Sequence, residues 1–232
     1  MFPDGMKSIY ARGKKMSNRV TYILAGGQLS LPFLKEQLNR HSDRTIIAAD
    51  RGLEACVSLG IEPDFVIGDF DSPDETVREE FLSQEKNVTK LNPIKDDTDT
   101  EAALSLAFEK TEGDIIILGG TGTRLDHVLG NIGILGQGFA HGRSVELLDE
   151  HNRIRLADGP VTIKKGEQYG KYVSLLPLTT EVKGLTLEGF YYPLHKFTLT
   201  SYTSIGISNE IVEEEARISF DEGVLVMIES KD

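Results

Sequence analysis

The 232-residue sequence has no tryptophan, a single cysteine and no long apolar run. One cysteine excludes an intramolecular disulfide, and Cys56 lies at helical spacing with Leu53 and Val57, so we expect it to be a buried apolar side chain. No apolar segment approaches the roughly 20 residues that a membrane span needs, and the amino terminus lacks the apolar core of a secretory signal. We therefore expect a cytoplasmic protein without a membrane partner.

Positive charge is also scarce, because 25 lysines and arginines stand against 37 aspartates and glutamates, which gives a formal net charge of -12. This balance argues against nucleic acid or an anionic membrane surface as the main partner. The length is sufficient for one large domain or two smaller ones with cores of their own. The sequence therefore favours a cytoplasmic enzyme or binding protein.

The pattern of apolar residues changes near residue 158. Residues 1–17 show no clear periodicity and are expected to form a loosely ordered leader. In residues 18–157 short apolar runs alternate with helical patterns, which predicts an α/β domain with a parallel, Rossmann-like sheet in three layers. Residues 158–232 contain period-two runs separated by glycine turns, which predict an all-β sandwich or barrel.

Three segments of the α/β part have the features of helices. Residues 72–84 and 98–110 both begin with a capping box, in which Ser72 or Thr98 is the N-cap and a glutamate follows three residues later. Residues 124–135 place four apolar side chains at helical spacing, and we expect that stripe to be buried. The stripe consists of Leu125, Val128, Leu129 and Ile132.

Acidic residues follow two of the predicted strands. Asp50 ends "IIAAD", while Asp69 and Asp71 follow the apolar run at 65–67. Residues two apart in an extended chain point the same way, so Asp69 and Asp71 should face one spot. Two unit charges about 4 Å apart repel by roughly 1 kcal/mol in water and about 4 kcal/mol at an effective dielectric constant near 20. A hard divalent cation would offset that repulsion.

Further polar residues are expected at the same edge of the sheet. Lys95, Thr98 and Asp99 stand where a helix begins, and a glycine turn precedes Arg124 and Asp126. Each feature alone has a simpler explanation as a cap or turn, and the glycines match neither of the familiar phosphate-binding loops. Because the carboxyl ends of parallel strands share one edge, we predict that these residues meet around a magnesium–nucleotide site.

Four segments of this part, "AADRG", "PDFVIGDFDS", "KDDTDTEAAL" and "GGTGTRLDH", resemble the thiamine pyrophosphokinase family in order and approximate spacing. The tail, with "SIGISNE" and "ARISFDEGVLVMI", resembles the end of that family. The resemblance covers most of the chain beyond the leader. It implies transfer of the terminal pyrophosphate of Mg-ATP to the hydroxyethyl oxygen of thiamine, giving thiamine diphosphate and AMP. It also implies an α/β nucleotide domain, a thiamine-binding β-sandwich, and a homodimer with sites between subunits.

Carried over position by position, the resemblance assigns a role to each matching residue. Magnesium and the phosphates would lie among Asp50, Asp69, Asp71 and Asp99. The nucleotide side would be lined by Lys95, Thr98, Arg124 and Asp126, and thiamine would meet Ser208 and Asn209, from the partner subunit. Asp71 is our candidate for the base that accepts the hydroxyl proton, with Asp69 as a neighbouring catalytic carboxylate. Asp99 as the base, or no protein base at all, remains open.

The absence of tryptophan leaves the contact with the thiamine rings open, because some relatives place an aromatic side chain there. The thiazolium ring is a cation, which an aromatic face suits. Tyr202 and Phe190 are candidates, and packing in the core of the β domain is the alternative for both.

Two other functions remain open at this point. The same metal–phosphate edge would serve a different alcohol, such as a pterin carbinol, if the tail selected one. A non-catalytic magnesium–nucleotide sensor whose β tail forms dimers is the second alternative.

Overall fold

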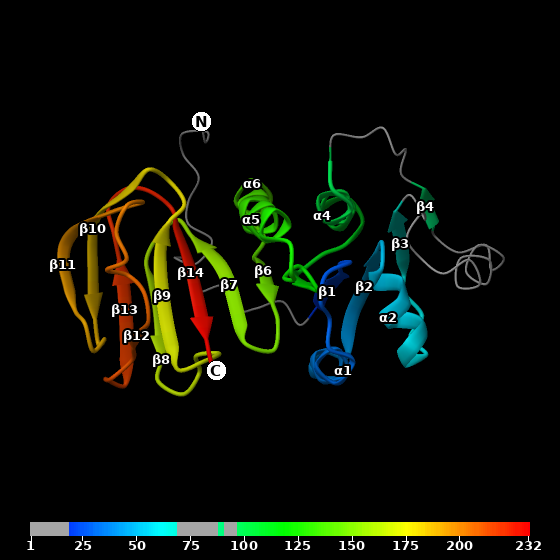
Figure 1. The fold of residues 1–232 in the computed structure, drawn as a ribbon, viewed down its shortest axis with the longest axis horizontal. Helices are drawn as coiled ribbons and strands as arrows, with labels where there is room; N and C mark the ends of the chain where they lie inside the picture. Colours follow the sequence, from blue (N-terminus) through cyan, green and yellow to red (C-terminus); the bar gives the residue numbers. More distant parts are fainter. Residues whose placement is uncertain (1–18, 69–87, 91–96) are drawn as a thin grey trace. The chain divides into compact units, whose positions relative to one another are not determined.

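The computed structural model describes residues 19–68, 88–90 and 97–232, and the chain divides into two units (Figure 1). The α/β unit contains the described residues up to Ile134 together with Leu147–Glu150. The β unit contains Leu135–Glu146 and His151–Asp232. The boundaries at residues 17 and 157 that the sequence suggests stay predictions.

The α/β unit is built on parallel strands. Its elements are β1 (Arg19–Leu24), α1 (Leu31–Arg40), β2 (Asp43–Ala49), α2 (Gly52–Leu59), β3 (Phe65–Gly68), β4 (Val88–Lys90), α4 (Asp99–Lys110), β5 (Asp114–Leu118) and α5 (Leu125–Ile134). The strands lie in the order β5-β1-β2-β3-β4, and each neighbouring pair is parallel. The parallel sheet predicted from the alternating pattern is therefore confirmed.

Helices cover both faces of this sheet. Helices α2 and α4 both pack on β1 and β2, while α1 contacts α2 and α5 contacts α4. Figure 1 shows α1 and α2 on one side of the strands and α4 and α5 on the other. Strands enclosed in this way are apolar nearly throughout, as in the "DIIIL" of β5, where four of five residues are buried.

Capping residues set where two of the helices begin. The Thr98 hydroxyl oxygen accepts a hydrogen bond from the Glu101 N–H at 3.2 Å, which confirms the helix predicted at 98–110. Ser30 caps α1 in the same way and accepts from the Phe33 N–H at 3.5 Å. The helix predicted at residues 72–84 lies outside the described residues.

Helix α5 forms where the sequence predicts it, but its apolar stripe is not buried. Leu125 is 73% exposed and Leu129 is 69% exposed, and the buried residue of α5 is the polar Asn131. The expectation for these two leucines was wrong because helical periodicity shows that a helix has an apolar face without showing which neighbour covers it. Leu125 and Leu129 thus lie on the surface of this unit.

Cys56 is fully buried in α2, and burial raises the pKa of its thiol to about 12. Because the thiolate is the reactive form, we expect the native protein not to react with a thiol reagent at pH 8. Reaction of one thiol per chain should appear only on unfolding, and titration with a chromogenic disulfide in the presence and absence of denaturant measures this. Rapid labelling without denaturant would contradict the burial.

The β unit is antiparallel and encloses its own core. Its elements are α6 (Gln137–His141), β7 (Asn152–Ala157), β8 (Val161–Lys164), β9 (Tyr172–Pro177), β10 (Glu181–Glu188), β11 (Leu194–Thr200), β12 (Asn209–Glu210), β13 (Glu215–Ser219) and β14 (Leu225–Ser230), while β6 (Val145–Leu148) straddles the division between the units. The strand order is β12-β9-β14-β7 in one sheet and β11-β10-β13-β8 in the other. Apolar side chains from both sheets form one cluster, which confirms the sandwich.

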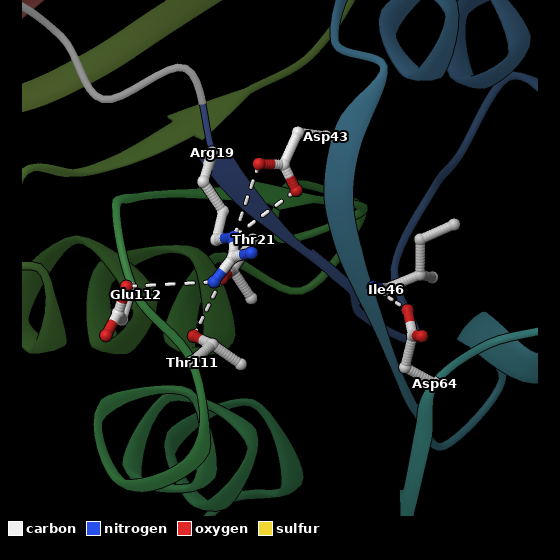
Figure 2. Close-up of polar contacts among 7 residues, drawn as sticks. All are labelled: Arg19, Thr21, Asp43, Ile46, Asp64, Thr111 and Glu112. Atoms are coloured by element: carbon white, nitrogen blue, oxygen red, sulfur yellow. Dashed lines mark hydrogen bonds and ion pairs between the residues drawn. The ribbon is translucent and has the colours of Figure 1, made fainter.

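The amino end of the parallel sheet carries polar contacts (Figure 2). The Arg19 guanidinium lies 3.2 Å from the Asp43 carboxylate and 3.7 Å from that of Glu112, all largely exposed. The buried Thr21 hydroxyl donates to the Thr111 hydroxyl at 2.7 Å. These contacts join the ends of secondary-structure elements and lie at the opposite end of the strands from Asp50.

No helix in the described part of the chain is long and apolar enough to span a membrane.

Candidate functional site

Two glycine-containing turns are hydrogen-bonded to each other at the carboxyl ends of β1 and β5. The Gly27 N–H donates to the Gly119 carbonyl at 2.9 Å, and the Gln28 N–H donates to the Thr121 carbonyl at 3.0 Å. A Cβ atom on Gly27 would stand 2.3 Å from the Thr121 oxygen and 2.4 Å from the Gly119 oxygen. Gly119 has a φ of 71°, which favours glycine. Only glycine at position 27 therefore permits this close approach.

A cavity of about 500 Å³ lies over these turns, within the α/β unit. Its walls come from the carboxyl ends of strands and the first turns of α4 and α5, as expected for an open parallel sheet. The lining residues are Ala25, Gly26, Gly27, Gln28, Asp50, Arg51, Thr98, Asp99, Thr100, Gly119, Gly120, Thr121, Gly122, Thr123, Arg124, His127, Val128 and Asn131.

The cavity brings together four residues that the sequence singles out: Asp50, Thr98, Asp99 and Arg124. Asp50 directly follows β2 and has a φ of 50°, a left-handed conformation that is uncommon outside glycine. Its backbone carbonyl accepts a hydrogen bond from the Leu53 N–H at 3.2 Å, and its own N–H donates to the Ile67 carbonyl at 3.1 Å. Asp50, after β2, and Asp99, at the start of α4, thus line one cavity although they lie far apart in the sequence.

Arg124 is paired with Asp126 at the edge of this cavity. The guanidinium makes two contacts with the carboxylate, of 3.2 Å through Nε and 2.5 Å through Nη2. Hydrogen bonding to Arg124 lowers the pKa of the Asp126 carboxyl below its ordinary value. Because a lowered pKa preserves the charged form, the pair is complete at neutral pH and is lost only as the pH falls below the ordinary range of an aspartate.

Replacing Asp126 tests whether this pair orients Arg124 for ATP, the nucleotide that the sequence resemblance implies. We expect Asp126→Asn to raise the KM for ATP about two- to five-fold, since an exposed ion pair contributes little and the amide keeps one acceptor. Initial rates at varied ATP measure the effect. Glu36→Gln, which removes the exposed pair between Glu36 and Arg40 on α1, is the matched control and should leave that KM unchanged. Equal rises of the KM for ATP in both variants would contradict a role of Asp126 in orienting Arg124.

The remaining sequence-predicted residues of the metal and phosphate site are Asp69, Asp71 and Lys95, which lie outside the described residues. Within the described ranges no three His, Cys, Asp or Glu side chains gather closely enough to hold a metal ion. Magnesium in enzymes is often held by one or two carboxylates, with water and substrate oxygens in its other positions. Asp50 and Asp99, which line the same cavity, are residues of the type that magnesium takes as ligands.

The predicted thiamine residues lie in the β unit. Ser208 is exposed, whereas Asn209 is 5% exposed and its amide bonds the backbone of Tyr192. Of the two aromatic candidates, Phe190 is buried in the core of the sandwich, which was the alternative for it. Tyr202 is 93% exposed.

Sequence reasoning missed several residues of the cavity in the α/β unit. Gly26, Gly27 and Gln28 follow a predicted strand, so a glycine pair at a strand end was the available signal. Asn131 is buried, and its Nδ2 donates to the Gly120 carbonyl at 2.7 Å, which anchors α5 to the second glycine turn. A polar residue inside the apolar pattern of a helix was its signal.

Comparison with known proteins gives consistent results for both parts of the chain. Residues 36–147 match the family model "Thiamin pyrophosphokinase, catalytic domain", and residues 160–225 match "Thiamin pyrophosphokinase, vitamin B1 binding domain". A thiamine pyrophosphokinase of Bacillus subtilis (strain 168) is 36% identical over 212 residues, which are 90% of this chain and 98% of that protein.

Solved structures agree with these matches. The crystal structure of thiamine pyrophosphokinase from Bacillus subtilis has a TM-score of 0.81 and 33% identity, covering 92% of this chain and 99% of that one. The thiamin pyrophosphokinase from Geobacillus thermodenitrificans has a TM-score of 0.79 and 32% identity, covering 92% and 98%. The yeast thiamin pyrophosphokinase, at 15% identity and a TM-score of 0.72, shares the fold over 96% of this chain and 89% of its own.

Proposed function

Since this chain belongs to the thiamine pyrophosphokinase family, we propose that the cavity of its α/β unit binds ATP with magnesium and is where pyrophosphate transfer takes place. The protein is a thiamine diphosphokinase, which transfers pyrophosphate from ATP to thiamine. The observation that supports this location is that Asp50, Asp99 and Arg124 line one cavity with the two glycine turns.

Phosphoryl-type transfer requires little covalent chemistry from a protein. It requires the two reacting oxygens to be held in line, and it requires neutralisation of the charge that spreads over the phosphate oxygens. Arg124 supplies a fixed planar cation that can contact two phosphate oxygens at once. Thr98 adds a hydroxyl group at the N-terminus of α4, where the helix dipole favours an anion. The cavity thus combines positioning with positive charge.

The carboxylates of the cavity complement those cations. We propose that Asp50 and Asp99, with Asp69 and Asp71 from the sequence, hold magnesium, and that Lys95 contributes a further positive charge. Bound magnesium would neutralise phosphate charge and fix the orientation of the polyphosphate chain. Asp71 stays our candidate for the base, and Asp69 stays a catalytic carboxylate beside it. Asp99, or no protein base, is the alternative.

The β unit is proposed to supply the acceptor side. Ser208 and Asn209 lie in the segment that resembles the thiamine contacts of the family, and residues 160–225 match its vitamin B1 binding domain. A homodimer with sites shared between subunits, and a cytoplasmic location, complete the proposal. The homodimer rests on the family resemblance, and the cytoplasmic location rests on the apolar pattern of the sequence.

Product formation from purified protein tests the function directly. With ATP, magnesium and thiamine, we expect thiamine diphosphate and AMP to appear in equal amounts, measured by chromatography. A pterin carbinol in place of thiamine should give no AMP above the background without acceptor. Faster AMP release with the pterin alcohol, or binding of ATP without turnover in the presence of thiamine, would overturn the assignment.

A further inference from the structure

The segment that contains Ser208 and Asn209 is held rigidly within the β unit. The Gly206 carbonyl accepts the Leu175 N–H at 2.8 Å, and the Ser174 hydroxyl oxygen accepts the Ser208 N–H at 2.9 Å. Ser208 has a φ of 55°, a conformation that costs a serine free energy and persists only where neighbouring contacts impose it. Backbone strain of this kind occurs often at ligand-binding segments.

The side chain of Asn209 is used almost entirely inside the protein. Its Oδ1 accepts the Tyr192 N–H at 2.9 Å and the Glu210 N–H at 3.0 Å, and its Nδ2 donates to the Tyr192 carbonyl at 2.8 Å. A carboxamide has two acceptor sites and two N–H donors, so three of its four capacities are filled. Because Asn209 is also buried, little of it is left for a ligand.

These bonds fasten the turn that contains Tyr191 and Tyr192 to β12. The Tyr191 N–H also donates to the Glu210 carbonyl at 2.8 Å, and Phe190 forms a β-bridge with Ile211. Each residue of the turn is therefore bonded to one residue of the segment 209–211: Phe190 to Ile211, Tyr191 to Glu210 and Tyr192 to Asn209. Buried Phe190 anchors the turn in the core of the sandwich.

This turn presents two aromatic rings to solvent. Tyr191 is 65% exposed and Tyr192 is 61% exposed, and their ring centroids lie 4.9 Å apart with an interplanar angle of 83°. Edge-to-face contact keeps the two rings in one mutual orientation. An exposed aromatic pair on a fixed backbone is suited to bind a cation, which the face of an aromatic ring attracts. The chain contains no tryptophan that would supply this face instead.

We propose that Asn209 is a positioning residue, and that the Tyr191–Tyr192 pair it braces is the surface that contacts the cationic ring of thiamine. This inference rests on the proposed function and assigns to Asn209 an indirect role in place of a direct contact with the substrate. Ser208, exposed beside the brace, remains free to bond the ligand.

A double-mutant cycle separates the two roles of Asn209, because residues that act through each other have non-additive effects. We expect Tyr192→Ala to raise the KM for thiamine about 3- to 30-fold, the range that loss of a cation–π contact gives, with the KM for ATP within about two-fold. Asn209→Ala should raise the same KM to a similar degree. The variant with both changes should exceed the larger single effect by no more than about two-fold.

Two controls accompany the cycle. Tyr192→Phe keeps the ring and should stay near the wild-type KM, and Leu178→Ala removes an exposed apolar side chain of the β unit outside the brace and should have no effect. If Asn209→Ala fails to fold, Asn209→Asp takes its place in the cycle and should raise the same KM. Its carboxylate still accepts from the Tyr192 and Glu210 N–H groups, which favours folding, but it cannot donate to the Tyr192 carbonyl, so the brace is weakened.

Calorimetric titration of thiamine into the same variants gives a second measure that does not depend on turnover. Multiplied effects of the two changes would overturn the inference, because they indicate a direct contact by Asn209. An equal rise in the KM for ATP, or an equal loss of thiamine affinity in Leu178→Ala, would also overturn it. Absence of thiamine diphosphate formation by the wild-type protein, with thiamine binding still lost in Tyr192→Ala, would instead contradict the proposed function alone.

Discussion

Asp50→Asn is expected to lower kcat about 100-fold or more, because it removes a full negative charge from the cavity proposed to hold Mg-ATP. The fold should be retained. Asp50 has a φ of 50°, and asparagine adopts this left-handed conformation at least as readily as aspartate. Steady-state rates at saturating ATP and thiamine measure the loss, and thermal unfolding confirms that the variant is folded.

The same strand provides a matched control. Asp43 begins β2 and Asp50 follows its last residue, so the two carboxylates mark opposite ends of one strand. Asp43→Asn removes an exposed contact with Arg19 (Figure 2), which should change stability by less than about 1 kcal/mol and leave kcat unchanged. Normal turnover of Asp50→Asn, or comparable losses in both variants, would exclude Asp50 from the site.

A larger effect of Asp50→Asn at low than at high magnesium would connect this carboxylate with the metal. Loss of a ligand weakens metal affinity, and added metal then restores part of the rate by mass action. We expect the magnesium concentration that gives half-maximal rate to rise at least about ten-fold in the variant. An unchanged magnesium requirement would leave Asp50 in the cavity but separate it from the metal.

Much of the site could be predicted because the carboxyl ends of parallel strands necessarily meet at one edge. Asp50 follows β2 and Asp99 begins α4, and a rule about strand ends places both at that edge without any knowledge of the loops between. Thr98 was equally accessible, because a capping box is a local signal that depends on four residues only.

Other features depend on contacts that no local pattern encodes. Leu125 and Leu129 follow a regular helical stripe and are nevertheless exposed, because burial depends on which element packs against α5. The role of Asn209 depends on the approach of Tyr192, 17 residues away, through a turn whose geometry is set by tertiary packing. Sequence resemblance assigned Asn209 to the thiamine contacts but gave no indication that its amide is already bonded within the chain.

Gly27→Ala is expected to lower both stability and activity, because the added Cβ atom would lie 2.3 Å and 2.4 Å from two carbonyl oxygens. Both oxygens belong to the backbone of the neighbouring turn, so the turns must separate and lose the 2.9 Å bond between Gly27 and Gly119. Overpacking of this kind costs about 1–3 kcal/mol. For a chain of this length the midpoint of thermal unfolding should fall by roughly 2–12 °C, and the rate should fall well below wild type even where the variant is folded.

Gly122→Ala is the matched control, since it adds the same methyl group within the same cavity. There the Cβ atom would lie 3.4 Å from the Gln28 nitrogen, an ordinary contact distance. Its unfolding midpoint should stay within about 2 °C of the wild type. Calorimetry of the two variants side by side therefore tests whether close approach of the two backbones, rather than added bulk in the cavity, requires glycine at position 27. If both midpoints fall equally, the hydrogen-bonded turns are not the feature that Gly27 maintains.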